Sequence, residues 1–189
     1  MGEVVLVRHG QTEWSRDGKH TSRTDVALTA EGRRQAEALG EALRERSFVA
    51  VWTSPRARAM ESCRLAGLGD VAAVRDELRE WEYGSYEGRT TAEIQDERPG
   101  WTLWGVGVPD GETAEEVGAR ADRVVAELRQ LDGDAAVFSH GHFLRVLTAR
   151  WLGLDPRDGR LFALDTGTIG VLGYEREIAV VRLWNEPPR

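Results

Sequence analysis

Two short motifs place a histidine directly after an apolar run of residues. Arg8-His9-Gly10 follows the aliphatic run 4–7, and Ser139-His140-Gly141 follows a second run that begins at Ala135. Such runs are typical of strands buried on both faces, and ligands bind at the carboxyl ends of strands in open α/β sheets. A guanidinium can hold two phosphate oxygens while an imidazole nitrogen reaches phosphorus. The two motifs therefore predict a phosphate site at one edge of a sheet.

Two further segments carry the other groups that such a site needs. The tripeptide Arg-His-Gly is common by chance, and alone it favours a surface arginine beside a half-buried histidine. Residues 54–58 follow the apolar run 49–53 and add two arginines, and residues 78–84 follow a third run and add two glutamates. If these strands are parallel neighbours, all four segments meet at one edge of the sheet.

These residue types could transfer a phosphoryl group without a metal. One histidine attacks phosphorus, while the arginines and the second histidine neutralise charge on the equatorial oxygens. A carboxylic acid protonates the leaving oxygen and then acts as a base toward water. A metal site is the competing interpretation of histidines near a carboxylate, but the neighbouring arginines repel a divalent cation. We therefore expect no metal and no other cofactor.

The composition of the chain limits which classes of partner and which cellular location are expected. The chain has 189 residues and a formal net charge of −7, which argues against nucleic acid and anionic membranes as partners. Its one cysteine, Cys63, excludes an intramolecular disulfide and thiolate metal sites, and is expected to be a small buried hydrophobe. We see no signal peptide and no apolar run of membrane-spanning length, so the expected location is cytoplasmic. The sequence leaves open whether the chain forms homo-oligomers.

Strands alternate with helices along the chain, which predicts an α/β fold with a mostly parallel sheet covered on both faces. Thr29 is a candidate N-cap for a helix to about Arg46, and a capping box at Thr113 and Glu116 begins a helix to about Leu131. We expect one domain, 1–189, with strands at 4–7, 49–53, 71–74 and 135–139, helices at 54–67 and 140–152, β-structure from 161 to 184, a polar loop at 13–27 and a lid at 76–112.

The motifs together resemble the histidine phosphatase superfamily, also called the phosphoglycerate-mutase-like family. The resemblance covers nearly the whole chain, through residues 8–14, Thr24-Asp25, residues 28–32 and the three later segments. It implies a three-layer α/β/α sandwich. It also implies His9 as the phosphorylated nucleophile and Glu80 as the proton donor, with a phosphate pocket formed by Arg8, Arg58 and His140. Arg58 rather than Arg56 matches the family arginine because Ala59 follows it.

Residues 78–88, which read LREWEYGSYEG, resemble a subgroup that contains mycobacterial acid phosphatases and a fungal sedoheptulose-bisphosphatase. Residues 111–113 and 139–142 fit the same subgroup. The family often has asparagine where this chain has Ser15, whose hydroxyl can still donate one hydrogen bond to a phosphate oxygen although its reach is shorter.

The remaining candidates surround this core of residues. Glu82 is the rival of Glu80, because two residues apart in an extended segment share one face. His20 is expected to be solvated or at the substrate rim, and His142 to act at a helix terminus or behind the site. We predict catalytic roles for His9, Glu80 and His140 and substrate binding by Arg8, Arg58, Ser15, Thr21, Tyr83 and Gly141.

We therefore predict a metal-independent phosphatase that hydrolyses small phosphorylated metabolites through a phosphohistidine. One alternative is a cofactor-dependent phosphoglycerate mutase, and another is a non-catalytic phosphate-binding module. The resembling mutases carry extra cations in the lid, including an arginine pair after a tryptophan. Here Trp104 is followed by Gly105 and Val106, and only Arg89 and Arg98 are basic between residues 88 and 111.

Overall fold

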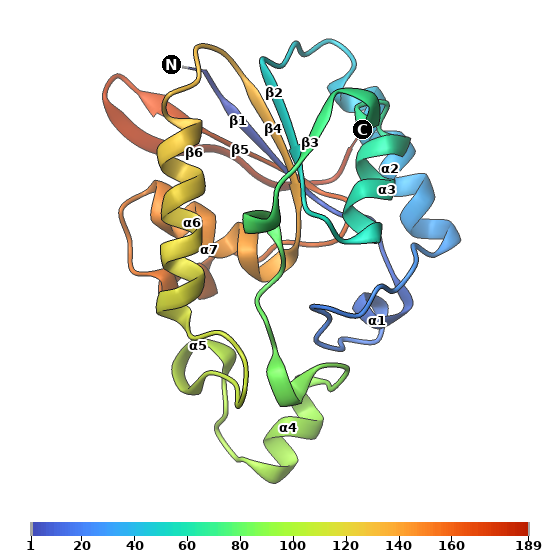
Figure 1. The fold of residues 1–189 in the computed structure, drawn as a ribbon, viewed down its shortest axis with the longest axis vertical. Helices are drawn as coiled ribbons and strands as arrows, with labels where there is room; N and C mark the ends of the chain where they lie inside the picture. The colour runs from blue at the N-terminus through green and yellow to red at the C-terminus, as the bar shows by residue number, and fades with distance from the viewer. Residues whose placement is uncertain (1, 189) are drawn as a thin grey trace.

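A single six-stranded sheet of order β3-β2-β4-β1-β5-β6 forms the centre of the computed structural model, which describes residues 2–188 (Figure 1). The prediction of a mostly parallel sheet is confirmed, because the strands β1 to β4 all run parallel to one another. The two C-terminal strands add an antiparallel hairpin beside β1. The strands are β1 (Val4–Arg8), β2 (Ala50–Thr53), β3 (Ala72–Val74), β4 (Ala135–Ser139), β5 (Ile169–Glu175) and β6 (Ile178–Glu186).

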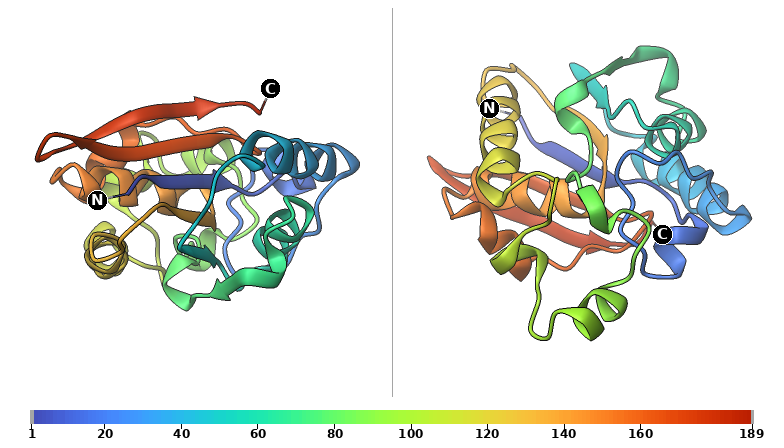
Figure 2. Two further views of the ribbon diagram at one scale, coloured as in Figure 1. Left: turned by 90° about the horizontal axis from the view of Figure 1, so that it is seen from above. Right: turned by 60° about the horizontal axis from the view of Figure 1, so that its bottom comes forward.

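Helices cover both faces of this sheet, so the expected three-layer sandwich is confirmed. Alternate residues of β1 point to opposite faces: Val5 and Val7 belong to one buried cluster, and Val4 and Leu6 to the other. The first cluster includes residues of α2 (Ala30–Leu43) and α3 (Ala57–Leu65). The second includes residues of α6 (Ala114–Leu128) and α7 (Gly141–Trp151). The left view in Figure 2, from above, shows α6 and α7 on one side of the molecule and α2 and α3 on the other.

The predicted helix starts at Thr29 and Thr113 are confirmed. The Thr29 hydroxyl accepts from the N–H of Gly32, and Thr113 forms the expected capping box with Glu116. The helix expected to reach Arg46 ends instead at Leu43. The helix expected to begin at Ser54-Pro55 begins at Ala57, because Arg56 keeps an extended backbone with φ −74° and ψ 133°.

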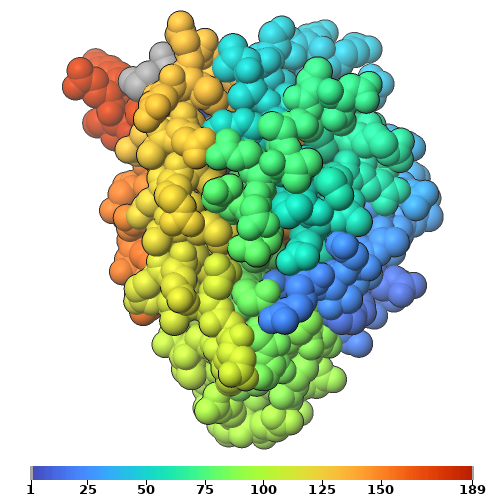
Figure 3. Space-filling view, in the orientation of Figure 1, coloured from blue at the N-terminus to red at the C-terminus, as the bar shows by residue number. Residues whose placement is uncertain are grey.

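Regular structure also occurs where the sequence indicated loops. The expected loop 13–27 contains α1 (Glu13–Arg16), and a capping box between Thr12 and Ser15 starts it. The expected β-structure near 161 is wrong, since Pro156–Leu161 is a 3₁₀ helix. The lid, residues 76–112, contains α4 (Thr91–Glu97) and α5 (Leu103–Val106). It lies beyond the carboxyl ends of the parallel strands, at the bottom of the views in Figures 1 and 3.

The expectation that Cys63 is buried is confirmed, and two tryptophans of the lid are buried as well. Trp81 and Trp101 of the lid are buried and pack in the core rather than standing free. Cys63 is buried, and burial raises the pKa of its thiol to about 12, so it is not a thiolate at neutral pH. None of the helices within residues 2–188 is long and apolar enough to cross a membrane.

Candidate active site

His9 lies directly after β1, where the main chain turns at Gly10. Its Nδ1 atom lies 2.8 Å from the carbonyl oxygen of Gly10. Because a carbonyl can only accept, Nδ1 carries the proton and Nε2 keeps its lone pair. A Cβ atom at residue 10 would lie 2.1 Å from the carbonyl oxygen of Gly32, so the turn requires glycine. The local backbone thus leaves Nε2 as the nitrogen that can attack phosphorus.

Two buried arginines surround this imidazole. Nε of Arg58 lies 3.3 Å from Nε2 of His9, and the rest of its guanidinium donates to the backbone carbonyls of Thr21, Ser22 and Thr24. Arg8 donates to the carbonyl of Leu164. Burial, and then the positive charges of Arg58 and Arg8, hold the pKa of His9 well below its usual value. His9 is therefore neutral, as a nucleophile must be.

His140 follows β4, the strand that pairs with β1, and this pairing brings the two histidines together. Their ring centroids are 5.1 Å apart. Burial, then Arg58 and His9, hold the pKa of His140 well below its usual value. Its Nε2 lies 2.7 Å from Oγ of Ser54, whereas its Nδ1 has no hydrogen-bond partner among the described residues.

Glu80 is held at the N-terminus of α7 by three backbone N–H groups. Its Oε1 accepts from Trp81 at 2.9 Å and from Phe143 at 2.8 Å, and its Oε2 accepts from His142 at 3.1 Å. These three bonds fix the carboxyl group at the wall of the cavity that contains His9. Glu82, the rival candidate, forms an ion pair with Arg23 at 3.0 Å and does not line the cavity that contains His9. The geometry thus favours Glu80 as the acid.

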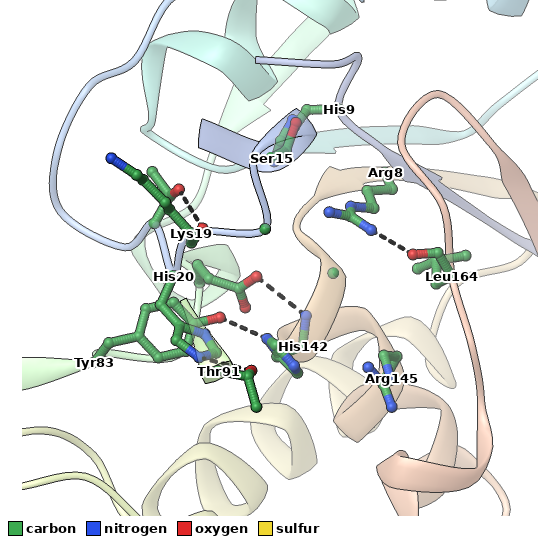
Figure 4. Close-up of a pocket in the computed structure, with 14 residues that line it drawn as sticks. Arg8, His9, Ser15, Lys19, His20, Tyr83, Thr91, His142, Arg145 and Leu164 are labelled. Carbon is green, nitrogen blue, oxygen red and sulfur yellow. Dashed lines mark hydrogen bonds between the residues drawn. The ribbon is translucent and has the colours of Figure 1, made fainter. Parts of the chain in front are cut away.

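A cavity of about 230 Å³ opens at this edge of the sheet (Figure 4). It is lined by most of the predicted site residues. Arg58 and His140 do not line it themselves, but each lies beside His9, which does. A Cβ atom at Gly141 would lie 3.1 Å from Cζ of Arg8, which explains the glycine there. The predicted residues that line the cavity are Arg8, His9, Ser15, Thr21, Glu80, Tyr83 and Gly141.

Three of the residues predicted to bind substrate already use their hydroxyl groups within the protein. The Ser15 hydroxyl donates to the carbonyl of Thr12 at 3.0 Å and accepts from its N–H at 2.8 Å. The Thr21 hydroxyl donates to the carbonyl of Lys19 at 3.1 Å. The Tyr83 hydroxyl lies 2.6 Å from Nδ1 of His142. Their contribution to substrate binding therefore stays a prediction.

Several lining residues were missed or misplaced by the sequence analysis. Of the two alternatives for His20, solvent is wrong: the side chain is buried, it lines the cavity, and its ring lies 4.8 Å from that of Tyr83 (Figure 4). Lys19 and Arg145 also line the cavity. Helical periodicity was a usable signal for Arg145, since it stands four residues after Gly141 on the same face of α7. Lys19 lies in a loop, where no such pattern exists.

No group of three or more histidine, cysteine, aspartate or glutamate side chains within residues 2–188 could hold a metal ion. The expectation of a metal-independent reaction rests on the arginines and stays a prediction.

Comparison with known proteins shows the family of the chain. The sequence of residues 4–187 matches the profile of the histidine phosphatase superfamily, branch 1. The chain is 43% identical to an acid phosphatase of Mycobacterium tuberculosis, over 97% of this chain and 94% of that protein. It is 34% identical to the sedoheptulose 1,7-bisphosphatase of Saccharomyces cerevisiae, over 90% of this chain and 86% of that protein.

A solved structure and a mutase relative complete the comparison. The structure of an open reading frame product from Mycobacterium tuberculosis superposes with a TM-score of 0.94 at 40% identity, covering 100% of this chain and 99% of that one. A 2,3-bisphosphoglycerate-dependent phosphoglycerate mutase of Mesorhizobium japonicum is 33% identical, over 87% of each chain. The predicted family is therefore confirmed, and the chain belongs to the histidine phosphatase superfamily.

Proposed function

We propose that this protein is a phosphatase that hydrolyses small phosphate monoesters through a phosphohistidine on Nε2 of His9. One observation carries the proposal. The lone pair of His9 Nε2 faces the guanidinium of Arg58, and the Gly10 carbonyl fixes the proton on the opposite nitrogen. A phosphoryl group that bonds to Nε2 takes the place of this hydrogen bond and keeps the Arg58 cation beside its equatorial oxygens.

The reaction proceeds in two steps. In the first, Nε2 of His9 forms a bond to phosphorus while the ester P–O bond breaks, and Glu80 gives its proton to the leaving oxygen. In the second, water attacks phosphorus, the P–N bond breaks, and Glu80 takes the proton from that water. Arg8, Arg58 and His140 stabilise the charge on the equatorial oxygens in both steps.

The cavity supports a small, polar phosphorylated metabolite as the substrate class. Away from His9 its wall carries the neutral hydrogen-bonding groups of His20, Tyr83 and Thr91, and also the cations Lys19 and Arg145. Such a wall suits the hydroxyl groups of a phosphorylated sugar and tolerates further negative charge. Phosphatase relatives include an acid phosphatase and a sugar bisphosphatase.

The organisation of the chain follows from the same geometry. We propose that residues 1–189 act as one domain in which the lid closes one side of the cavity, because Glu80, Tyr83 and Thr91 of the lid line it. We also retain the expected cytoplasmic location. The net charge of −7 supports an activity without nucleic-acid or membrane partners.

Substitution of the nucleophile tests the proposal. The wild-type protein should hydrolyse an aryl phosphate and form an acid-labile, base-stable phosphoenzyme, and His9→Ala should lose both properties. Loss of the covalent route should lower turnover by several orders of magnitude, at about 1.4 kcal/mol for each factor of ten. Circular dichroism of the variant controls for folding. Turnover near the wild-type level in a folded His9→Ala protein would refute the mechanism, and an inactive wild-type protein would favour a phosphate-binding module.

A further inference from the structure

Ser54 lies directly after β2 and touches the second histidine of the site. Its Oγ atom is 2.7 Å from Nε2 of His140, and both residues are fully buried. The strands that precede them are paired, with Thr53 opposite Phe138, so the sheet itself fixes this contact. Neither the two-step reaction nor the resemblance to the family uses the Ser54 hydroxyl.

The surroundings of Ser54 decide which partner supplies the proton. A serine hydroxyl has one proton and two lone pairs. The backbone N–H of Arg56 already donates to Oγ at 3.3 Å. Among residues 2–188, Nε2 of His140 is the only hydrogen-bond acceptor within reach of the Ser54 proton. Ser54 therefore donates to Nε2, and a neutral imidazole that accepts at Nε2 carries its own proton on Nδ1.

The opposite nitrogen of His140 has no partner. Nδ1 is buried and makes no hydrogen bond to any described residue, while the His140 ring lies 5.1 Å from the His9 ring. An unsatisfied buried donor is costly, so such a group is expected to meet an acceptor in the working complex. The equatorial oxygens of a phosphoryl group on His9 are acceptors of this kind.

We propose that Ser54 is a positioning residue that fixes His140 as the Nδ1–H tautomer and so presents an N–H donor to the phosphoryl group. The assignment of the phosphoryl group as the acceptor rests on the proposed function. The assignment of the tautomer depends only on the hydrogen bonds of the free protein.

Nuclear magnetic resonance tests the tautomer directly. We would label the full-length protein with ¹⁵N-histidine, record long-range ¹H–¹⁵N spectra at neutral pH, and assign the His140 signals with a His140→Gln variant. In the wild type, Nδ1 of His140 should show the shift of a protonated nitrogen and Nε2 that of an acceptor. Ser54→Ala should abolish the single tautomer, and Ser54→Thr, which keeps the hydroxyl, should restore it. A protonated Nε2 in the wild type would overturn the proposal even if both variants fail to fold.

Kinetics then test the consequence for phosphoryl transfer. Loss of a single preorganised donor lowers kcat by about 10²–10³-fold. Ser54→Ala leaves His140 in place, so we expect a loss of about 10- to 100-fold in kcat, with little change in KM. Thr148→Val is the matched control, because this fully buried hydroxyl donates only to the Leu144 carbonyl within α7. Wild-type kcat in Ser54→Ala would contradict the proposal but would leave the His9 mechanism intact, which the His9→Ala variant tests separately.

Discussion

Oε1 of Glu80 accepts a hydrogen bond from the backbone N–H of Phe143 at 2.8 Å, which ties the expected proton donor to the first turn of α7. His140 precedes the same helix and contributes to the phosphate pocket. One helix N-terminus therefore positions two groups that act at opposite ends of the bond being broken. Such fixed groups need no reorganisation during the reaction.

Substitution of Glu80 should lower the turnover of different substrates to different extents, depending on the leaving group. Glu80→Gln should slow alkyl phosphates by about 10²–10⁴-fold, because their leaving oxygen needs protonation, whereas aryl phosphates should lose much less. Steady-state kinetics with one ester of each kind measure the difference. Glu82→Gln is the control, since that carboxylate pairs with Arg23 at the rim. Equal losses on both esters, or a larger effect of Glu82→Gln, would reassign the acid.

The enzyme should stay active at mildly acidic pH because the His9 imidazole remains uncharged there. Burial and the neighbouring arginines hold the pKa of His9 well below its usual value, so the imidazole stays neutral as the pH falls below 6.5. The profile of kcat/KM should therefore show no loss from His9 protonation near pH 6.5. Arg58→Met removes one positive charge and should move the acid limb to higher pH. The same substrate in both proteins controls for the ionisation of the monoester, whose second pKa is about 6. A wild-type acid limb caused by a group near 6.5 would contradict this account.

The stability of the fold should decline in acid because of His20. Burial lowers the pKa of His20 to about 4. Between pH 6.5 and 4 the unfolded chain binds a proton at His20 that the folded chain does not, so His20 alone lowers the free energy of unfolding by about 1.4 kcal/mol per pH unit as the pH falls. Burial also lowers the pKa values of His9, His140 and His142, which add to this loss. Urea unfolding near pH 7.5 and pH 5 measures this loss. His20→Phe, beside Tyr83 and Trp101, should lose about 2 kcal/mol less than the wild type at pH 5. If the wild type and His20→Phe lose the same free energy of unfolding between pH 7.5 and pH 5, protonation of His20 does not contribute to the loss.

Chelators should leave the activity unchanged. Arg8 and Arg58 already supply positive charge beside His9, which is the work a divalent cation performs in metal-dependent phosphatases. Turnover before and after dialysis against EDTA tests this expectation. Complete loss that one divalent ion restores would show that the reaction needs a metal.

Phosphate release should exceed phosphoglycerate interconversion. Arg89 pairs with Glu97 at 2.8 Å and Arg98 donates to the Tyr86 hydroxyl at 3.0 Å, so neither basic residue of this part of the lid lines the cavity. A hydrogen bond from such an arginine to a phosphate group would stabilise a bound bisphosphorylated intermediate by about 1.5–3 kcal/mol. Without these bonds the intermediate should dissociate or be hydrolysed.

An assay with 3-phosphoglycerate and added 2,3-bisphosphoglycerate should show negligible mutase turnover. The reference is hydrolysis of the best phosphatase substrate under the same conditions. The cations Lys19 and Arg145 line the cavity outside the lid and are the residues to substitute if interconversion is found. Mutase turnover above phosphatase turnover would overturn the assignment.

The sequence predicted the features that depend on local patterns. The aliphatic run 4–7, the N-cap Thr29 and the capping box at Thr113 are each encoded within a few residues, and the structure confirms them. A capping box at Thr90 and Glu93 begins α4 in the same way, so this helix was also predictable although the lid was interpreted as irregular.

The remaining features depend on contacts between distant residues. The Tyr83 hydroxyl meets Nδ1 of His142 across 59 positions, and the Ser54 hydroxyl meets His140 across 86. No periodicity links such pairs, because the order of the strands in the sheet brings them together. For the same reason the sequence left His20 either in solvent or at the substrate rim, whereas in the structure the lid buries it against the cavity.

The place of β4 between β1 and β2 has a consequence for how the chain folds during synthesis. β1 and β2 make no ladder with each other, and both pair with β4 instead. Residues 135–139 leave the ribosome long after β1, β2 and β3. In the nascent chain β1 therefore lacks both of its partner strands, β2 can pair only with β3, and the site has no second histidine. Contacts of such long sequence separation form slowly. After dilution from denaturant, activity returns only when the central strand β4 has been inserted. Recovery of activity should therefore be slower than recovery of the helical circular dichroism signal.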